Sequence, residues 1–280
     1  MNPVVVDIGP LTLHSYAVWI LAGVLLALAL IAWRAARHDP AMVGPWLDVG
    51  LAALVGGVAG ARLLQMALVD ADAKGMAWHG ALLLGIPAAA GVAWLRHVDL
   101  RRWSDAAALG WPLVMAVVWR GCRNAGCGYG YEVATLADWP DWLAAELPDI
   151  YGLDAPRLDV QNGGVLWSAI LFALVLILTW RNWLPGLRLW VTLGVGALGL
   201  ALLGFFRADP AQTWADRRAD QVMDLLVLLC CTLLGGLLAL LDARRAAREE
   251  IDYENQAGPG PDRAEVGRQG GEPGAAPGTH

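Results

Sequence analysis

The chain has 280 residues, of which 57% are hydrophobic and 16% charged, and its formal net charge is −6. A soluble domain of this length carries about a quarter charged residues, and the charges here leave long stretches empty, so the composition excludes an ordinary soluble protein. The sequence contains no basic cluster that would indicate a nucleic acid as the protein's partner.

Seven apolar runs have the character of membrane-spanning segments. About 17 to 25 apolar residues cross the hydrocarbon core as a helix, and in lipid only helices or closed barrels satisfy every backbone group. Continuous runs favour helices over barrel strands. We therefore expect an all-α integral membrane protein with about seven transmembrane helices in residues 1–250. The runs are Tyr16–Trp33, Trp46–Val69, Ala81–Leu95, Ala106–Val118, Gly164–Trp180, Leu187–Phe206 and Val222–Leu241.

Three segments outside or at the edge of these runs have their own character. The first run has no basic region before it and no small-residue cleavage pattern, which predicts a retained span rather than a signal peptide. Residues 122–162 are too polar to span, and Trp139 and Trp142 stand there among acids and prolines. Because Trp prefers the membrane interface, we expect an external cap. The composition of residues 251–280 predicts a disordered cytoplasmic tail.

The charges of the connecting segments alternate between the two predicted sides. Arginines follow the first, third, fifth and seventh runs, and acids gather on the other side. Because cytoplasmic loops are enriched in Lys and Arg, the pattern predicts an external N-terminus and a cytoplasmic C-terminus. The arginines are Arg34, Arg37, Arg96, Arg101, Arg102, Arg181, Arg188, Arg244, Arg245 and Arg248, and the acids are Asp7, Asp70, Asp72, Asp138, Asp141, Glu146 and Asp149.

Several polar side chains lie where the predicted spans reach the outer side. Each alone has an ordinary explanation, since span-end arginines reach headgroups and tyrosines join aromatic belts. Around one cavity, however, arginines suit a lipid phosphate, and a histidine can accept a proton near neutral pH. The pattern predicts an outward-side pocket for an anionic lipid. Its members are Tyr16, Arg62, His79, Arg120, Arg123 and Arg207.

The chain has four cysteines, namely Cys122, Cys127, Cys230 and Cys231. They form no paired CxxC set, so we expect no zinc site. Cys122 and Cys127 lie near the predicted outer, oxidising side. Their spacing leaves a disulfide and plain packing both open.

The chain resembles the prolipoprotein diacylglyceryl transferase family over about residues 5–242. IGPLTLHSYAVWILAG, with Tyr16, is similar to the family's start, and GGVAGARLL, with Arg62, to its glycine-rich run ending in arginine. KGMAWHGALLLG resembles the family's histidine motif, with His79 in the histidine position and an alanine replacing the second glycine. GCRNAGCGYG resembles the cysteine-bearing form of the signature, which Gly130 closes. Asp105, LDVQN and FFRADP are similar to further family segments.

The resemblance implies a multi-pass enzyme of the bacterial plasma membrane. It would move a diacylglyceryl group from phosphatidylglycerol to the lipobox cysteine thiol of a prolipoprotein, with glycerol phosphate as leaving group and no cofactor. His79 is the expected base for the thiol, with Tyr16 as a second catalytic residue. The expected substrate- and phosphate-binding residues are Arg62, Arg120, Arg123, Asn124, Gly130 and Arg207.

Three positions depart from the family pattern. The family's signature arginine falls where this chain has Trp119, and Arg120 follows one residue later. One residue turns a helix by about 100°, so Arg120 does not directly replace it. An arginine and a glutamate of the family's sixth span correspond to Leu200 and Gly204. Two alternatives therefore stay open: an inactive paralogue that binds membrane lipid or lipoprotein, and a transferase for a different acceptor.

Overall fold

A computed structural model describes residues 4–8, 11–68 and 76–257. Within these ranges the chain forms seven α-helices, two short 3₁₀ helices and three two-stranded sheets. The α-helices are α1 (Ser15–His38), α2 (Val43–Leu68), α3 (Trp78–Leu95), α4 (Leu100–Ala125), α5 (Val160–Trp180), α6 (Arg188–Gly204) and α7 (Ala219–Ala257), and the 3₁₀ helices are η1 (Pro40–Met42) and η2 (Leu136–Asp138).

The mostly helical membrane fold predicted from the apolar runs is confirmed. No predicted span extends more than two residues beyond its helix. Among the described residues, five helices are long and apolar enough to cross a membrane, namely those within Tyr16–His38, Pro40–Leu68, Trp78–Leu95, Val160–Trp180 and Ala219–Tyr253. The apolar helix α6 is shorter, and α4 carries charged residues near both ends. Seven crossings and their direction therefore stay predictions.

Close backbone contact joins α2 to α3. A Cβ atom on Gly60 would collide with the carbonyl oxygen of Gly80, and one on Gly80 would collide with the carbonyl oxygen of Gly60. A Cβ on Gly85 would lie 3.0 Å from the carbonyl oxygen of Ala53. Small residues at helix contacts let helix backbones approach closely in membranes. This contact holds the first turn of α3, and with it His79, against α2.

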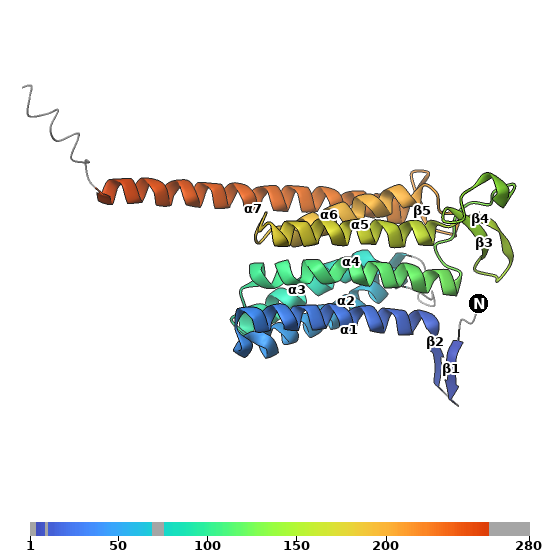
Figure 1. Ribbon diagram of the computed structural model, residues 1–280, viewed down its shortest axis with the longest axis horizontal. Helices are drawn as coiled ribbons and strands as arrows, with labels where there is room; N and C mark the ends of the chain where they lie inside the picture. The colour runs from blue at the N-terminus through green and yellow to red at the C-terminus, as the bar shows by residue number, and fades with distance from the viewer. Residues whose placement is uncertain (1–3, 9–10, 69–75, 258–280) are drawn as a thin grey trace, which may run out of the picture. The chain divides into compact units, whose positions relative to one another are not determined.

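Helix α4 packs against α1, α5 and α6 (Figure 1). Its buried residues Ala108, Leu109 and Met115 form an apolar cluster with Leu171 and Val175 of α5. Many large apolar side chains remain exposed on the outer faces of the helices. Since exposed apolar area of this extent suits hydrocarbon rather than water, the helix surfaces agree with a membrane environment.

Three β-hairpins, which the sequence did not lead us to expect, connect or precede the helices. They are β1 (Val4–Ile8) with β2 (Leu11–His14), β3 (Ala144–Pro148) with β4 (Asp154–Leu158), and β5 (Thr213–Trp214) with β6 (Arg217–Arg218). The labelled strands lie at one end of the helices, and the α1–α2, α3–α4 and α5–α6 connections lie at the other (Figure 1). The predicted cap is narrower than residues 122–162, because α4 continues to Ala125 and α5 begins at Val160.

The first compact unit of the chain ends within α7, at Gly235. The second unit begins at Gly236 and continues α7 as a helix to Ala257, past the predicted start of the tail at Ile251. Residues 258–280 of the predicted tail, together with Asp70 and Asp72, lie outside the described residues.

Candidate functional site

A buried histidine–carboxylate pair joins the first turn of α3 to the start of α7. His79 Nε2 lies 2.8 Å from Asp224 Oδ1, and the two side chains are 6% and 5% exposed. Trp78 Nε1 donates to the same Asp224 oxygen at 3.1 Å. The ring of Trp78 also lies beside that of His79, with a centroid distance of 4.4 Å. Two donors therefore hold one carboxylate in a site that is almost closed to solvent.

Contacts behind the pair fix both helix ends. The Ala77 amide donates to the Ala61 carbonyl of α2 at 3.1 Å, which places the start of α3. In α7, Gln221 donates from Nε2 to the Ala201 carbonyl of α6 at 3.0 Å. The side chain of Gln221 also fills the space beside Gly204. The α2 and α6 backbones thus position the elements that carry His79 and Asp224.

The pair has the arrangement of a base and its orienting carboxylate. In the neutral imidazole, a carboxylate at Nε2 favours the proton on that nitrogen, which leaves Nδ1 as the acceptor. When Nδ1 takes a proton, the nearby carboxylate stabilises the resulting imidazolium. The geometry thus leaves His79 Nδ1 able to accept a proton, with Asp224 orienting the ring from the other side.

A neutral network of two arginines and two carboxylates lies one helical turn from Asp224. Arg207 donates to Asp209 at 2.6 Å and to Asp220 at 2.9 Å. Arg218 reaches the same two carboxylates at 3.4 and 3.1 Å. Burial alone would lower the pKa of Arg207, but its hydrogen bond and charge contact with Asp209, and the charge of Asp220, raise that pKa above its ordinary value. The charge of Arg207 is thus balanced within the protein.

The network and the histidine pair share one face of α7, because Asp220 and Asp224 are four residues apart. Backbone bonds also connect Arg207 to the glycine-rich signature segment. The Ala208 amide donates to the Tyr129 carbonyl at 2.9 Å, and Gly130 pairs with Arg207 as an isolated bridge. Burial, followed by the charge of Asp149, raises the pKa of Tyr129 above its ordinary value. Its hydroxyl therefore stays protonated at neutral pH and does not compete as a base.

The signature segment itself is held by internal contacts. Arg123 binds Asp159 through Nε and one terminal nitrogen, both at 3.0 Å. Asp159 in turn caps α5 by accepting from the Asn162 amide at 2.8 Å. A disulfide joins Cys122 to Cys127, which resolves the alternatives that the spacing left open. Arg123 thus ties the last turn of α4 to the start of α5, the two helix ends between which the cap lies.

Backbone crowding explains the glycine that closes the motif. Gly130 is buried, and a Cβ atom there would collide with the Leu158 carbonyl oxygen. The φ angles of Gly126 and Gly128 are +69° and +66°, in the left-handed region that glycine adopts without strain. The segment is therefore a tight, glycine-dependent turn between α4 and the cap.

The other predicted site residues differ in their surroundings. Arg120 is exposed at the end of α4, and its side chain makes no hydrogen bond or ion pair with another described residue. Arg62, Asn124 and Tyr16 are half-buried, and the Tyr16 ring packs beside Gly121 next to Arg120. Arg120 is thus the predicted phosphate ligand whose charge is most open to a ligand.

Closely packed side chains cover two of the positions that depart from the family pattern. The Trp119 indole is buried and covers Gly164 so closely that a Cβ atom on Gly164 would lie 2.3 Å from two of its carbon atoms. Gly204 is likewise covered by Gln221. The third position, Leu200, packs at the edge of the apolar α4–α5 cluster. Packed side chains therefore stand where the family has charged ones, and the interior is closed at these positions.

Sequence reasoning proposed His79 as a candidate site residue but did not include Asp224, its partner in the structure. The signal for it was present, because Asp224 is an acid inside the apolar segment VMDLLVLL. An ionisable residue within a predicted span is a candidate functional residue by default.

Comparison with known proteins gives two matches. The family model of prolipoprotein diacylglyceryl transferase matches residues 3–237. A phosphatidylglycerol–prolipoprotein diacylglyceryl transferase of Symbiobacterium thermophilum is 27% identical over 272 residues, which cover 88% of this chain and 95% of the relative.

Proposed function

The chain belongs to the prolipoprotein diacylglyceryl transferase family, and we propose that its donor is phosphatidylglycerol and that its catalytic centre is built on His79 and Asp224. As a member of that family it is a membrane transferase that moves a diacylglyceryl group to a prolipoprotein. The proposed acceptor is the thiol of the lipobox cysteine.

The reaction needs a base and a site for the leaving phosphate. The thiol sulfur attacks the diacylglyceryl carbon that carries the phosphate, so a C–S bond forms and a C–O bond breaks. Glycerol phosphate leaves with one more negative charge than the phosphodiester had, and the thiol proton passes to His79 Nδ1. The thiolate is the reactive form of the thiol, and a positioned base contributes typically 10²–10⁴-fold to such a step.

The observation that carries the proposal is the 2.8 Å contact between the buried His79 ring and Asp224. A histidine with an ordinary boundary role would not need a buried carboxylate from a helix 145 residues away in the sequence. Buried carboxylates are costly unless hydrogen-bonded, and here Trp78 supplies a second donor. The arrangement supports an imidazole prepared to receive a proton.

For the leaving phosphate we propose Arg120, with Arg62 as a second ligand. Arg120 is exposed, and Tyr16 packs against the neighbouring Gly121. An arginine presents a planar fork of donors that matches a phosphate, and donors placed where charge develops stabilise the transition state. Arg123 and Arg207, whose charges are met by carboxylates, hold the surrounding segments.

The arginine pattern further supports an orientation in a bacterial plasma membrane. The first turns of α1 and α3 and the last turn of α4 lie at the end of the helices that carries the hairpins. If that end faces outward, the proposed centre meets secreted prolipoproteins, and the loop arginines at the other end face the cytoplasm.

Complementation tests the proposal. In cells depleted of their own transferase, the wild-type chain should restore lipoprotein lipidation, and His79→Ala should abolish it at equal membrane abundance. His97→Ala is the matched control, because His97 is exposed in the turn after α3. Full lipidation by His79→Ala would overturn the proposed base.

A second candidate function, a non-catalytic lipid- or lipoprotein-binding module, rests on a specific observation. Trp119 and Gly204 stand where the family has charged residues, and both positions are filled by packing. A wild-type chain that inserts correctly, binds phosphatidylglycerol and never restores lipidation would favour this module over the transferase.

A further inference from the structure

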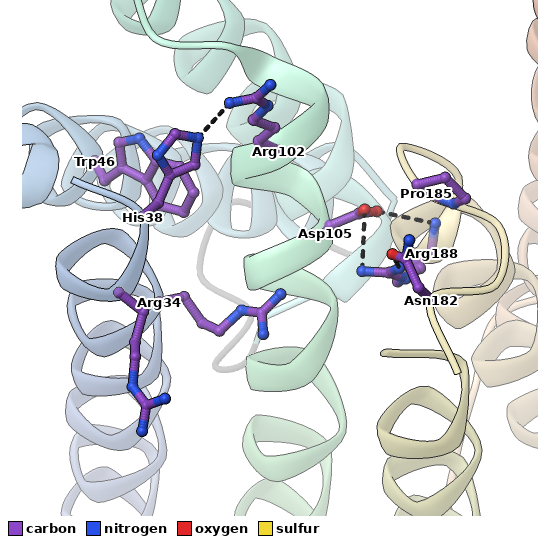
Figure 2. A pocket seen from close by; sticks show the side chains of 9 residues that line it. Arg34, His38, Trp46, Arg102, Asp105, Asn182, Pro185 and Arg188 are labelled. Atoms are coloured by element: carbon purple, nitrogen blue, oxygen red, sulfur yellow. Dashed lines mark hydrogen bonds and ion pairs between the residues drawn. The ribbon is translucent and has the colours of Figure 1, made fainter. Parts of the chain in front are cut away.

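A polar cavity lies at the opposite end of the helices from His79. Its volume is about 370 Å³, within the range of about 300–1,000 Å³ of small-molecule sites. Side chains from α1, α2, α4, the α5–α6 connection and α6 line it (Figure 2). The lining residues are Arg34, Arg37, His38, Trp46, Arg102, Asp105, Asn182, Pro185 and Arg188.

One side of the cavity is a rigid, charge-neutral frame. Asp105 is buried and accepts from the amides of Gly186 at 2.8 Å and Arg188 at 3.2 Å. The buried Arg188 guanidinium lies 3.3 Å from Asp105 and also donates to Asn182 at 2.9 Å and to the Trp183 carbonyl at 3.1 Å. Each of these groups is satisfied, so the frame shapes the cavity without needing a ligand.

The other side carries positive charge in excess. Arg34 is half-buried, and its side chain makes no hydrogen bond or ion pair with another described residue. Arg37 is exposed and stacks on Trp33 at 5.0 Å. Arg102 donates to His38 and pairs with the exposed Asp99 at 3.2 Å. Arg34 and Arg37 thus add positive charge without a paired carboxylate among the described residues, Arg102 shares its charge with the exposed Asp99, and the single lining carboxylate, that of Asp105, is already neutralised.

Other acids near this end are engaged elsewhere. Asp48 binds Arg96 at 2.6 Å, and Asp39 caps the short helix η1 through the Ala41 amide. Neither carboxylate lines the cavity or forms an ion pair with Arg34 or Arg37.

The surroundings favour a lipid over a soluble anion. Trp33, Trp180 and Trp183 are 50%, 79% and 57% exposed and belong to the last turn or two of α1 and α5 and the turn after α5. Exposed tryptophans of this kind mark the membrane–water interface. The cavity thus lies at the depth of phospholipid headgroups, where basic pockets between helices bind anionic lipids.

We propose that this cavity binds the phosphate of an anionic phospholipid headgroup through Arg34, Arg37 and Arg102. The site is separate from the proposed catalytic centre, and the inference does not rest on the transfer reaction. Guanidinium forks match phosphate oxygens, often through two parallel hydrogen bonds.

Lipid binding to the full-length chain in a neutral detergent tests the proposal. Native mass spectrometry and thermal unfolding would compare phosphatidylglycerol, phosphatidylcholine, inorganic phosphate and glycerol 3-phosphate. The wild type should retain one more phosphatidylglycerol than Arg34→Gln/Arg102→Gln, in which that binding weakens about tenfold or more. Arg181→Gln is the matched control, because Arg181 lies at the same end, stacks on Trp180 and does not line the cavity.

Each outcome decides the proposal. Equal phosphatidylglycerol retention by the wild type and the double variant, or equal binding of phosphatidylcholine, would overturn it. Equal stabilisation by the soluble phosphates would keep an anion site but overturn its assignment to a lipid. Should the double variant not fold, Arg37→Gln, which changes one exposed side chain, supplies the same comparison. Transfer activity in both variants should match the wild type, which separates this site from the catalytic centre.

Discussion

Replacement of Gly164 by alanine should destabilise the protein through a single contact. The added methyl group would lie 2.3 Å from two carbon atoms of the buried Trp119 indole, far inside van der Waals contact. Because the indole also lies against Gly128, 3.0 Å from where a Cβ atom there would sit, it has little room to move away. Adding volume to a packed interior costs typically 1–3 kcal/mol. For a chain of this size, the melting temperature should fall by about 2–10 °C.

A double-mutant cycle isolates that contact. Trp119→Ala alone should cost about 3–5 kcal/mol, as is usual when a buried aromatic is removed. In that background Gly164→Ala should cost little or nothing, because its methyl group enters the vacated space. The two changes should thus couple by about 1–3 kcal/mol. Circular dichroism of the detergent-solubilised chain during heating measures all four variants.

The control is Gly91→Ala in α3, since nothing lies within 4 Å of a Cβ atom at that glycine. Removing a glycine from an open helix position should leave stability unchanged or raise it by up to about 1 kcal/mol. If Gly164→Ala behaves like Gly91→Ala, or if the cycle shows no coupling, the packing account of Trp119 is wrong.

Three further changes test other parts of the site. Asp224→Asn should lower transfer at least about 10²-fold and alter its pH dependence, because the base loses its charged partner, whereas the exposed Asp216→Asn should match the wild type in the same assay. Arg123→Met leaves the buried Asp159 without its cation, so we expect a loss of about 1–3 kcal/mol and faster proteolysis of the cap, and unchanged proteolysis would contradict the anchoring role. Arg207→Gln leaves two carboxylates to one arginine, so the chain should lose on the order of 2 kcal/mol in thermal unfolding, whereas a more stable variant would contradict the network.

The helices could be predicted from the sequence because lipid imposes a simple constraint. A long apolar run has to satisfy its backbone internally, and a helix does so within the segment itself. Each predicted span therefore falls on a helix, although α4 and α7 extend well beyond theirs, to Ala125 and Ala257, because polar residues can continue a helix outside the apolar run. The hairpins were not predicted, because strands of two to five residues are too short to show a clear alternation of apolar and polar residues.

The site could be predicted only in part. His79 was identifiable because a histidine at the edge of an apolar run is uncommon, but its pairing with Asp224 depends on how α3 and α7 pack. The sequence led us to expect a phosphate-binding role for Arg207, and it did not show that the carboxylates of Asp209 and Asp220 form ion pairs with the Arg207 guanidinium. Asp209 is only two residues from Arg207, but Asp220 reaches Arg207 from the start of α7, and spacing along the chain does not reveal that contact.

The most direct test of the central claim is transfer by the purified chain itself. Phosphatidylglycerol and a lipobox peptide would be incubated with the protein in detergent, and mass spectrometry would follow the peptide and the released glycerol phosphate. We expect the wild type to add one diacylglyceryl group per cysteine thiol with equal release of glycerol phosphate, and His79→Ala to form neither product above the uncatalysed rate. Equal product formation by the wild type and His79→Ala, or no product from a folded wild-type chain that binds both substrates, would contradict a catalytic centre built on His79 and Asp224.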